Sequence, residues 1–447
     1  MSAPAYNRRE VYSWALYDFA NSAFATTILA VIFNQYFALK IAGGEKGVTI
    51  LGLHLHGASF FTFTVSVSLA ISAFLAPVLG AIADYSRAKK KMLIFFWSLG
   101  VTATALLYFV GEGTYLRAAL FFILANLGFA AGNVFYNAFL PEICPEEHLG
   151  WVSGLGWAVG YLGGGLLLAL NLVMLQYPHW LGFPKGFFTV QDCFFSVSVW
   201  WALFALPTMI WVRERSDQAS SPALQGTGNY VRIGFSRIFQ TLKKIKQFRQ
   251  LVRFLLAYLC YNEGVETVII MASIFGAEIV GFSQPELILF FLFIQATAFI
   301  GALLIGKLSD VWGNKPAITA TLIVWLSITV WAFFLGILGD MKKEYWLLGF
   351  LAGMVLGGSQ SSSRALQSQL TPLNASAEFF GFFGVVGKFS AIFGPLIYGL
   401  MIQLTGSLRW GILSLGILFA LGLLLLMRVD LNEGKREKEK AEQTGFI

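Results

Sequence analysis

Long apolar stretches recur along the whole chain and constrain its fold more than any other feature. A helix needs about 20 mostly apolar residues to cross a bilayer. Twelve stretches fit, at residues 12–38, 57–83, 91–111, 116–139, 149–175, 190–212, 251–277, 286–308, 315–338, 345–367, 377–404 and 408–428. Because a backbone in lipid must satisfy its own hydrogen bonds, such spans are helical. The sequence therefore predicts an all-α integral membrane protein with twelve transmembrane helices.

Composition excludes a soluble protein, because only 12% of the residues are charged, against about 25% in soluble domains. The net charge of +7 is compatible with nucleic acid or anionic lipid, but basic loops on one side of a membrane explain it better. We expect no nucleic-acid partner. The three cysteines and four histidines have no metal-ligand spacing, and we expect no metal or cofactor. We also expect no removable signal peptide.

The distribution of basic residues predicts the orientation. If the N-terminus lies inside, 23 of the 31 lysines and arginines fall on the inner side. This asymmetry predicts that both termini are cytoplasmic, and twelve spans give the same parity.

The longest stretch outside the spans divides the chain. Residues 213–250 are rich in Ser, Gly and Gln and then basic, which predicts a cytoplasmic linker. We therefore expect an N-terminal six-helix bundle at 1–212 and a C-terminal one at 251–429. The charged tail at 430–447 is expected to be a solvated helix or disordered.

Two repeats indicate that the halves are related. In the first span Asp18, Asn21 and Ser22 lie at i, i+3 and i+4, which is one helical face. Glu263, Glu266 and Thr267 repeat that spacing in the seventh span. A second repeat reads G-x-x-x-D before a short basic turn, at 80–91 with Asp84 and at 306–316 with Asp310.

The second repeat resembles the loop motif of the major facilitator superfamily, G-x-x-x-D-x-x-G-R-[RK]. Asp84 and Asp310 match its acid; the first copy lacks the usual glycine and the second lacks the arginine. Further stretches resemble the vacuole-effluxer-like branch, namely W-A-L-Y-D-F-A-N-S-A-F at 14–24, F-Y-N-A-F-L-P-E-I at 135–143, S-G-L-G-W-A-V-G-Y-L-G-G-G at 153–165, Y-N-E-G-V at 261–265, G-G-S-Q-S-S-S-R at 357–364 and F-F-G-F-F-G-V-V-G-K-F-S-A-I-F-G-P at 379–395.

This resemblance implies two pseudo-symmetric six-helix bundles of inverted three-helix repeats, working by alternating access. It implies that spans one, four, seven and ten line a cavity. It also implies that the motif carboxylates cap and pair across helix ends, holding the halves together in one state. Fungal members of the branch are linked to export of amino acids from the vacuole after autophagy.

Polar residues inside the spans are the candidates for function, because burying them in lipid is costly. For substrate or proton binding the candidates are Asp18, Asn21, Asn133, Asn137, Glu263, Glu266 and Gln360. Glu263 is the first choice, because it lies ~18 Å into its span at 1.5 Å per residue, close to the midplane. Asp18, ~9 Å deep by the same rise, is either a gate or an ion-pair partner.

Other charges are expected to gate the protein or to stabilise it, and these are Asp84, Arg87, Asp310, Arg364 and Lys388. Arg364 lies near an inner span end, where we expect it to snorkel to the interface, with anion binding as the alternative. Lys388 is expected either to pair with an acid or to bind a carboxylate.

We predict a secondary transporter of a small polar solute. The resemblance favours amino acids, and proton coupling is left open. The alternatives are a lipid or drug translocase on the same fold and a non-transporting membrane sensor. No phosphate-binding loop or catalytic cluster is evident, so we expect no enzyme. We expect a monomer whose partners are a small-molecule substrate and the bilayer, in the plasma membrane if bacterial or the vacuolar membrane if fungal.

Overall fold

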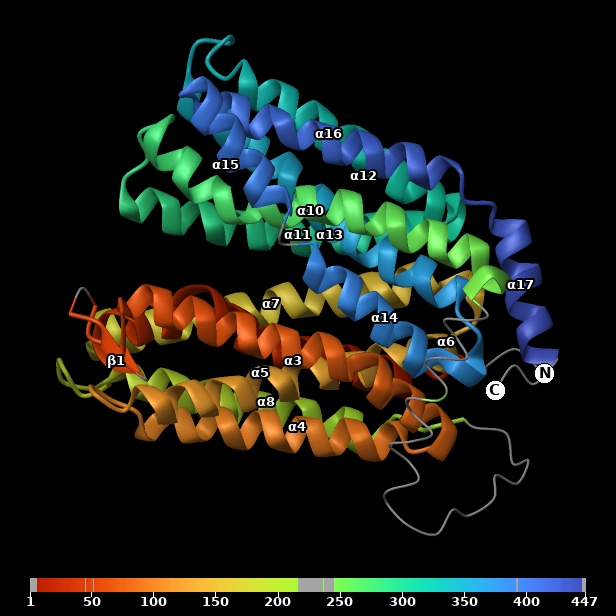
Figure 1. Cartoon of the computed structure of the whole chain (residues 1–447), viewed down its shortest axis with the longest axis horizontal. Coiled ribbons are helices and arrows are strands. Elements are labelled where there is room, and N and C mark those ends of the chain that lie inside the picture. Colours follow the sequence, from red (N-terminus) through yellow and green to blue (C-terminus); the bar gives the residue numbers. More distant parts are fainter. Residues whose placement is uncertain are drawn as a thin grey trace.

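A computed structural model describes residues 6–44, 46–50, 52–215, 236, 245–390 and 393–443. Figure 1 shows long helices in two stacks, one from each half of the chain. The first half contains α1 (Arg8–Ala23), η1 (Phe24–Val31), α2 (Phe33–Tyr36), η2 (Phe37–Ile41), β1 (Val48–Ile50), β2 (Leu53–Leu55), α3 (Gly57–Ser86), α4 (Lys89–Leu106), η3 (Leu107–Phe109), α5 (Tyr115–Ala138), α6 (Leu140–Ile143), η4 (Glu146–His148), α7 (Leu149–Gln176), η5 (Pro178–Leu181) and α8 (Val190–Trp211).

The second half contains η6 (Ile245–Phe248), α10 (Arg249–Glu278), α11 (Gln284–Trp312), α12 (Asn314–Phe333), α13 (Met341–Leu370), η7 (Leu373–Ala375), α14 (Ser376–Phe389), α15 (Phe393–Thr405), α16 (Leu408–Met427) and α17 (Leu431–Gln443). We call the end of the stacks where α1 begins and α16 ends the termini side, and the opposite end the far side. Most of the predicted linker 213–250 lies outside the described residues, and the predicted domain boundaries stay predictions.

Eleven stretches of the described chain are long and apolar enough to cross a membrane. Helix α13 coincides with the remaining predicted span, although its second half is rich in Gly, Ser and Gln. That polar half is buried against other helices from Gly357 to Arg364, apart from the half-buried Gln360. A span can be this polar when it faces protein rather than lipid.

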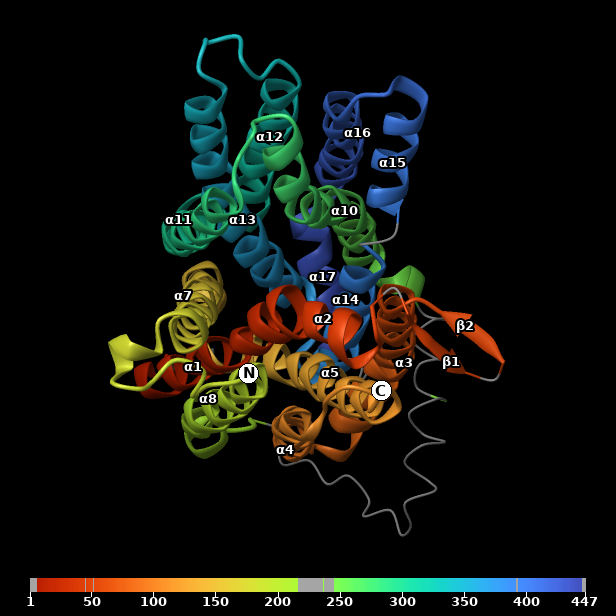
Figure 2. The same cartoon turned by 90° about the vertical axis from the view of Figure 1, so that its left-hand side faces the viewer.

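Each stack has its own hydrophobic core, one built mainly from α1 to α8 and the other mainly from α10 to α17. The two stacks meet through α7 against α11 and through α3 against α14. Figure 2 shows α7 and α11 facing each other across the junction. Close backbone approach requires glycine there: a Cβ on Gly154 would overlap the Ala302 carbonyl, and one on Gly80 would overlap the Ala377 carbonyl.

Three local features differ from a simple reading of the spans. The first span changes from α to π-helical geometry over Phe24–Val31. Between the first two spans, β1 and β2 pair in antiparallel fashion, with Val48 opposite Leu55 and Ile50 opposite Leu53. The predicted continuous span 377–404 is interrupted, because α14 ends at Phe389 and α15 begins at Phe393. Pro395 lies in the first turn of α15, a position near a helix start where proline is tolerated.

The charged tail forms the helix α17, which agrees with the predicted helix rather than with disorder. This helix contacts the rest of the protein and is not freely solvated. Lys435 forms an ion pair with Glu146 of the first half. Glu437 accepts the backbone N–H of Gln250 at 3.1 Å, and Glu442 accepts that of Leu373 at 2.9 Å. The tail helix therefore contacts both halves on the termini side.

Candidate functional site: the junction of the two bundles

Asp310 joins the two halves through backbone amides. Its carboxylate, near the end of α11, accepts the N–H groups of Gly150 at 2.8 Å and Trp151 at 3.1 Å, at the start of α7. The first amides of a helix lack partners within the helix, and its positive dipole end favours an anion. Gly306, one turn before Asp310, lets the helices touch, because a Cβ there would lie 2.8 Å from the Gly150 carbonyl oxygen.

Asp84 makes the pseudo-symmetric contact in the other direction. Its carboxylate, near the end of α3, accepts the N–H groups of Ala377 at 3.2 Å and Glu378 at 2.8 Å, at the start of α14. Gly80 again provides the close approach one turn earlier. The spacing G-x-x-x-D thus puts a small residue and a carboxylate on one face of a helix. Each of the two carboxylates caps a helix of the opposite half.

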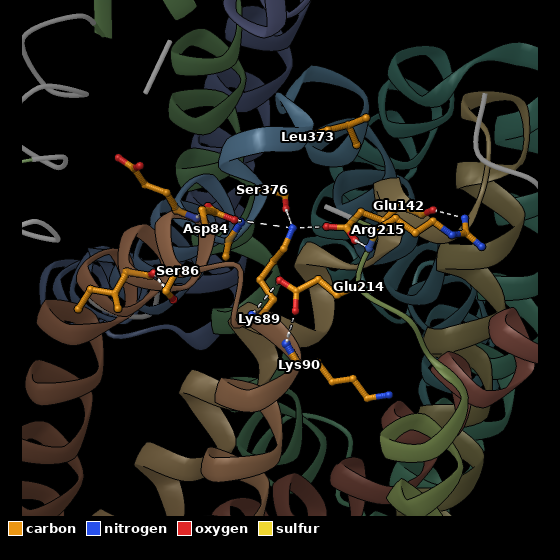
Figure 3. Close-up of polar contacts among 12 residues, drawn as sticks. Asp84, Ser86, Lys89, Lys90, Glu142, Glu214, Arg215, Leu373 and Ser376 are labelled. Atoms are coloured by element: carbon orange, nitrogen blue, oxygen red, sulfur yellow. Dashed lines mark hydrogen bonds and ion pairs between the residues drawn. The ribbon is translucent and has the colours of Figure 1, made fainter. Parts of the chain in front are cut away.

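A charged network surrounds Asp84 (Figure 3). The Lys89 ammonium is 5% exposed and lies 3.7 Å from the Asp84 carboxylate. It also pairs with Glu142 and donates to the Ser376 hydroxyl of α14 at 3.0 Å. Because Ser376 belongs to the second half, Lys89 adds a further link across the termini side.

The turn after each motif has left-handed backbone geometry. Gly313 has φ +94° after the second motif, whereas Arg87 has φ +51° at the matching position of the first. A non-glycine residue in this region costs about 1–2 kcal/mol. The missing glycine of the first copy therefore leaves the turn intact but strained.

A buried ion pair crosses the junction deeper in the molecule. The Arg364 guanidinium on α13 lies 2.8 Å from the Asp18 carboxylate on α1. Arg364 also donates to the Asn137 side chain at 3.2 Å and to the Ser153 hydroxyl and carbonyl at 3.0 and 2.7 Å. Tyr136 donates its hydroxyl to Asp18 at 2.9 Å. We expected Arg364 to snorkel, and that expectation is wrong: it is 3% exposed because α13 packs there against the first half rather than against lipid.

Aromatic rings and one glycine shape the space around this pair. The guanidinium carbon of Arg364 lies 4.9 Å from the ring centroid of Trp14 and 5.3 Å from that of Trp157. Such contacts stabilise a desolvated cation. A Cβ on Gly156 would lie 2.6 Å from the Arg364 guanidinium and 2.7 Å from the Asp18 carboxylate. Only glycine at position 156 leaves room for the pair.

A cavity of about 680 Å³ opens between the halves beyond the ion pair. Its walls come from α1, η1, α2, α7, α10, α11, α12, α13 and α16, mostly through apolar side chains, and polar groups include Ser22, Tyr161, Gln295 and Gln360. Tyr161 of α7 donates a hydrogen bond to Gln360 of α13. Ser22 and Gln360 are each four residues, about one helical turn, from Asp18 and Arg364. The ion pair therefore lies about one turn below the cavity, toward the termini side.

The structure separates the remaining candidate residues. Asn21 donates to Asn133 at 2.6 Å, within the first half. Glu263 lies elsewhere, at the interrupted span: its two oxygens accept the N–H groups of Phe393 at 3.0 Å and Gly394 at 2.6 Å. This buried carboxylate thus caps α15. Glu266 is half-buried one turn away.

Lys388 is half-buried near the end of α14. Among the described residues no carboxylate lies within ion-pair distance of it, so the acid pairing that we expected is not found there. Ser153 and Gly156 are site residues that sequence reasoning missed, as are Glu142 and Ser376 of the network around Asp84. For Ser153 and Gly156 the only signal was the small-residue run 153–165, which also suits ordinary helix packing.

A sequence profile described as "Vacuole effluxer Atg22 like" matches residues 6–439. The chain belongs to this family. An "Uncharacterized MFS-type transporter YxiO" of Bacillus subtilis (strain 168) is 34% identical over 416 residues, 93% of this chain and 93% of that relative. "Autophagy-related protein 22" of Botryotinia fuckeliana (strain B05.10) is 25% identical, over 87% of this chain and 70% of that relative.

Solved structures show the fold of this Atg22-like chain. The human organic anion transporter MFSD10 (TETRAN) matches with TM-score 0.69 and 15% identity, over 94% of this chain and 99% of that chain. The proton:xylose symporter XylE matches with TM-score 0.69 and 13% identity, over 97% of this chain and 98% of that chain. The predicted major facilitator fold and family are confirmed. The protein is a multi-pass membrane transporter of that superfamily, not an enzyme.

Proposed function

We propose that this Atg22-like protein is a secondary active transporter that moves a small polar solute by alternating access, with both termini in the cytoplasm. The observation that carries the proposal is the Asp18–Arg364 pair, whose partners come from opposite bundles about one turn below the cavity. A solute that reaches this pair would change the contact that holds the bundles together. Binding and gating would then be linked through one interaction.

Amino acids are the substrate class that we favour. The family description "effluxer" supports export of a solute, and the chemistry of the pair suits a zwitterion. A guanidinium binds carboxylates in a bidentate geometry, and a carboxylate binds an ammonium group. We further propose proton coupling through Asp18, because a proton on this carboxylate would remove the charge that faces Arg364.

Proteoliposomes loaded with a pH-sensitive dye test the proposal, with single amino acids added to native protein, Asp18→Asn and Arg364→Lys. The control is Asp340→Asn, because Asp340 caps α13 within its own half. We expect an amino acid to drive a dye response with native protein and control but with neither site variant. Amino-acid movement without a pH change would refute coupling, and no movement of any amino acid would refute the substrate class.

Misfolding must be separated from lost function. Removing one partner of a buried pair typically costs about 3–5 kcal/mol, because the other charge is left unpaired. The double variant Asp18→Asn/Arg364→Gln removes both charges. We expect it to regain most of the thermal stability without regaining transport.

A lipid or drug translocase is a second candidate, and the mostly apolar cavity wall favours it. It predicts transport that survives Asp18→Asn, since an apolar cargo needs no carboxylate. Uptake of a fluorescent lipid or an uncharged apolar dye in the same proteoliposomes distinguishes the two candidates.

A further inference from the structure

A second hollow lies on the termini side, away from the central cavity. It measures about 290 Å³ and lies between the start of α1 and the end of α8. Its lining includes Arg9 and Glu10 from α1, and Trp211, Arg213 and Arg215 from the end of α8 and the residues after it. The hollow shares no lining residue with the central cavity, and it is linked to the network around Asp84 through Arg215, which donates to Glu142.

The hollow carries excess positive charge. Glu10, its one acidic residue, is already neutralised: Arg215 forms an ion pair with it, and the Arg213 backbone N–H donates to it at 2.8 Å. Two guanidinium groups remain, those of Arg9 and Arg213. Over the described ranges neither has a carboxylate within ion-pair distance. The start of α1 adds the positive end of its helix dipole.

The Arg9 guanidinium is held in position by an aromatic ring. Its central carbon lies 4.2 Å from the centroid of the Trp211 ring, a favourable cation–π geometry. Ile210 and Trp211 are 61% and 38% exposed at the end of the span. Tryptophan is typical of the level where lipid headgroups meet the acyl chains. The hollow therefore lies at headgroup depth, with apolar surface beside it.

Basic residues at a span end are expected from topology alone. Topology does not require these basic residues to surround a hollow. Nor does it require the guanidinium groups of Arg9 and Arg213 to lack a carboxylate partner among the described residues while Arg215 forms an ion pair with Glu10. Arginine binds phosphate oxygens in a bidentate geometry, and basic pockets between spans bind anionic headgroups. We propose that this hollow binds the headgroup phosphate of an anionic phospholipid, with Arg9 and Arg213 on the phosphate and Ile210 and Trp211 beside the first acyl carbons.

The test uses the delipidated full-length protein in detergent and measures lipid binding by native mass spectrometry. Phosphatidylglycerol is compared with phosphatidylcholine of the same acyl chains. The site variant is Arg9→Gln/Arg213→Gln. The control is Arg428→Gln/Arg436→Gln, which removes the same charge from exposed positions at and beyond the end of the last span. Because all four side chains are exposed, we expect both variants to fold.

We expect native protein and control to prefer phosphatidylglycerol by about tenfold or more, and the site variant to lose this preference. Equal binding of the two lipids by native protein would overturn the proposal, and so would equal loss in site variant and control, which would indicate a general charge effect. Inorganic phosphate is added as a competitor. Full displacement of the lipid by millimolar phosphate would show a site for a free anion, and would also overturn it.

Discussion

Asp310 and Asp84 each join the two halves on the termini side by accepting backbone N–H groups, and we call these two contacts the clamps. Replacing Asp310 by asparagine should weaken the first clamp. The native carboxylate accepts two backbone N–H groups of α7. Asparagine offers one oxygen and places an NH₂ group where the second acceptor was. Hydrogen bonds to a charged group contribute about 1.5–3 kcal/mol each and neutral ones about 1 kcal/mol. A net loss of about 2 kcal/mol would change the ratio of closed to open termini side about 30-fold.

Spin labels can measure that ratio. Glu147 lies just before α7, and Trp312 ends α11, so cysteines at these positions report the separation of the two halves. Both residues are exposed, and the three native cysteines are first replaced by serine. If the closed form greatly predominates, a small open fraction is hard to measure. The double variant Asp84→Asn/Asp310→Asn is therefore included, because it should raise the open fraction further. We expect the fraction at long distance to rise with each substitution.

Asp340→Asn is the matched control, because Asp340 caps α13 through the N–H groups of Lys342 and Lys343, within the same half. It tests the loss of a helix cap without the loss of an inter-bundle contact. We expect its distance distribution to equal that of the native protein. A change of less than about threefold for Asp310→Asn, or an equal change for the control, would refute the clamp.

Three further predictions follow from other contacts. Glu263→Gln leaves one α15 amide without its acceptor. We therefore expect a lower midpoint of thermal unfolding but retained transport in proteoliposomes. Abolished transport in a variant of native stability would instead assign Glu263 to the substrate-binding site. Gly156→Ala should disrupt the ion pair and lower the free energy of unfolding by about 1–3 kcal/mol, whereas Gly165→Ala, whose Cβ meets open space, should be neutral. Lys435→Glu should favour the open termini side by a few-fold, because it repels Glu146. The spin-label assay should show this effect weaken at high salt, since surface pairs are screened, and the charge swap with Glu146→Lys should reverse it.

The sequence predicts the fold well, because membrane spans depend on local composition. Twelve apolar runs and a repeated motif are sufficient for two related halves. The interruption near Pro395 was missed, because hydropathy does not detect it. A proline inside an apolar run was not a sufficient signal, because Pro77 and Pro207 lie inside the uninterrupted helices α3 and α8.

The site was only partly predictable. Asp18 was singled out as a charge inside a span and Arg364 as a charge near a span end, but they are separated by 346 positions and meet only when the bundles dock. The position of Arg364 near a predicted span end misled us, because α13 continues to Leu370. The partners of Asp84 and Asp310 across the junction are backbone amides. Every residue except proline has such an amide, so no sequence pattern reveals them.

The two helices of the interrupted span, α14 and α15, pack against different sets of helices. Helix α14 packs against α3 and α5, and its residues Ala377 and Phe380 belong to the core of the first half. Helix α15 packs against α10 and α16 of the second half. One span thus contacts both bundles, and α14 itself contacts both, because its Phe379 belongs to the core of the second half. In the alternating-access cycle that we propose, α14 must therefore move relative to α3 or relative to α15, and Glu263 of α10 holds the start of α15 to the second half through the N–H groups of Phe393 and Gly394.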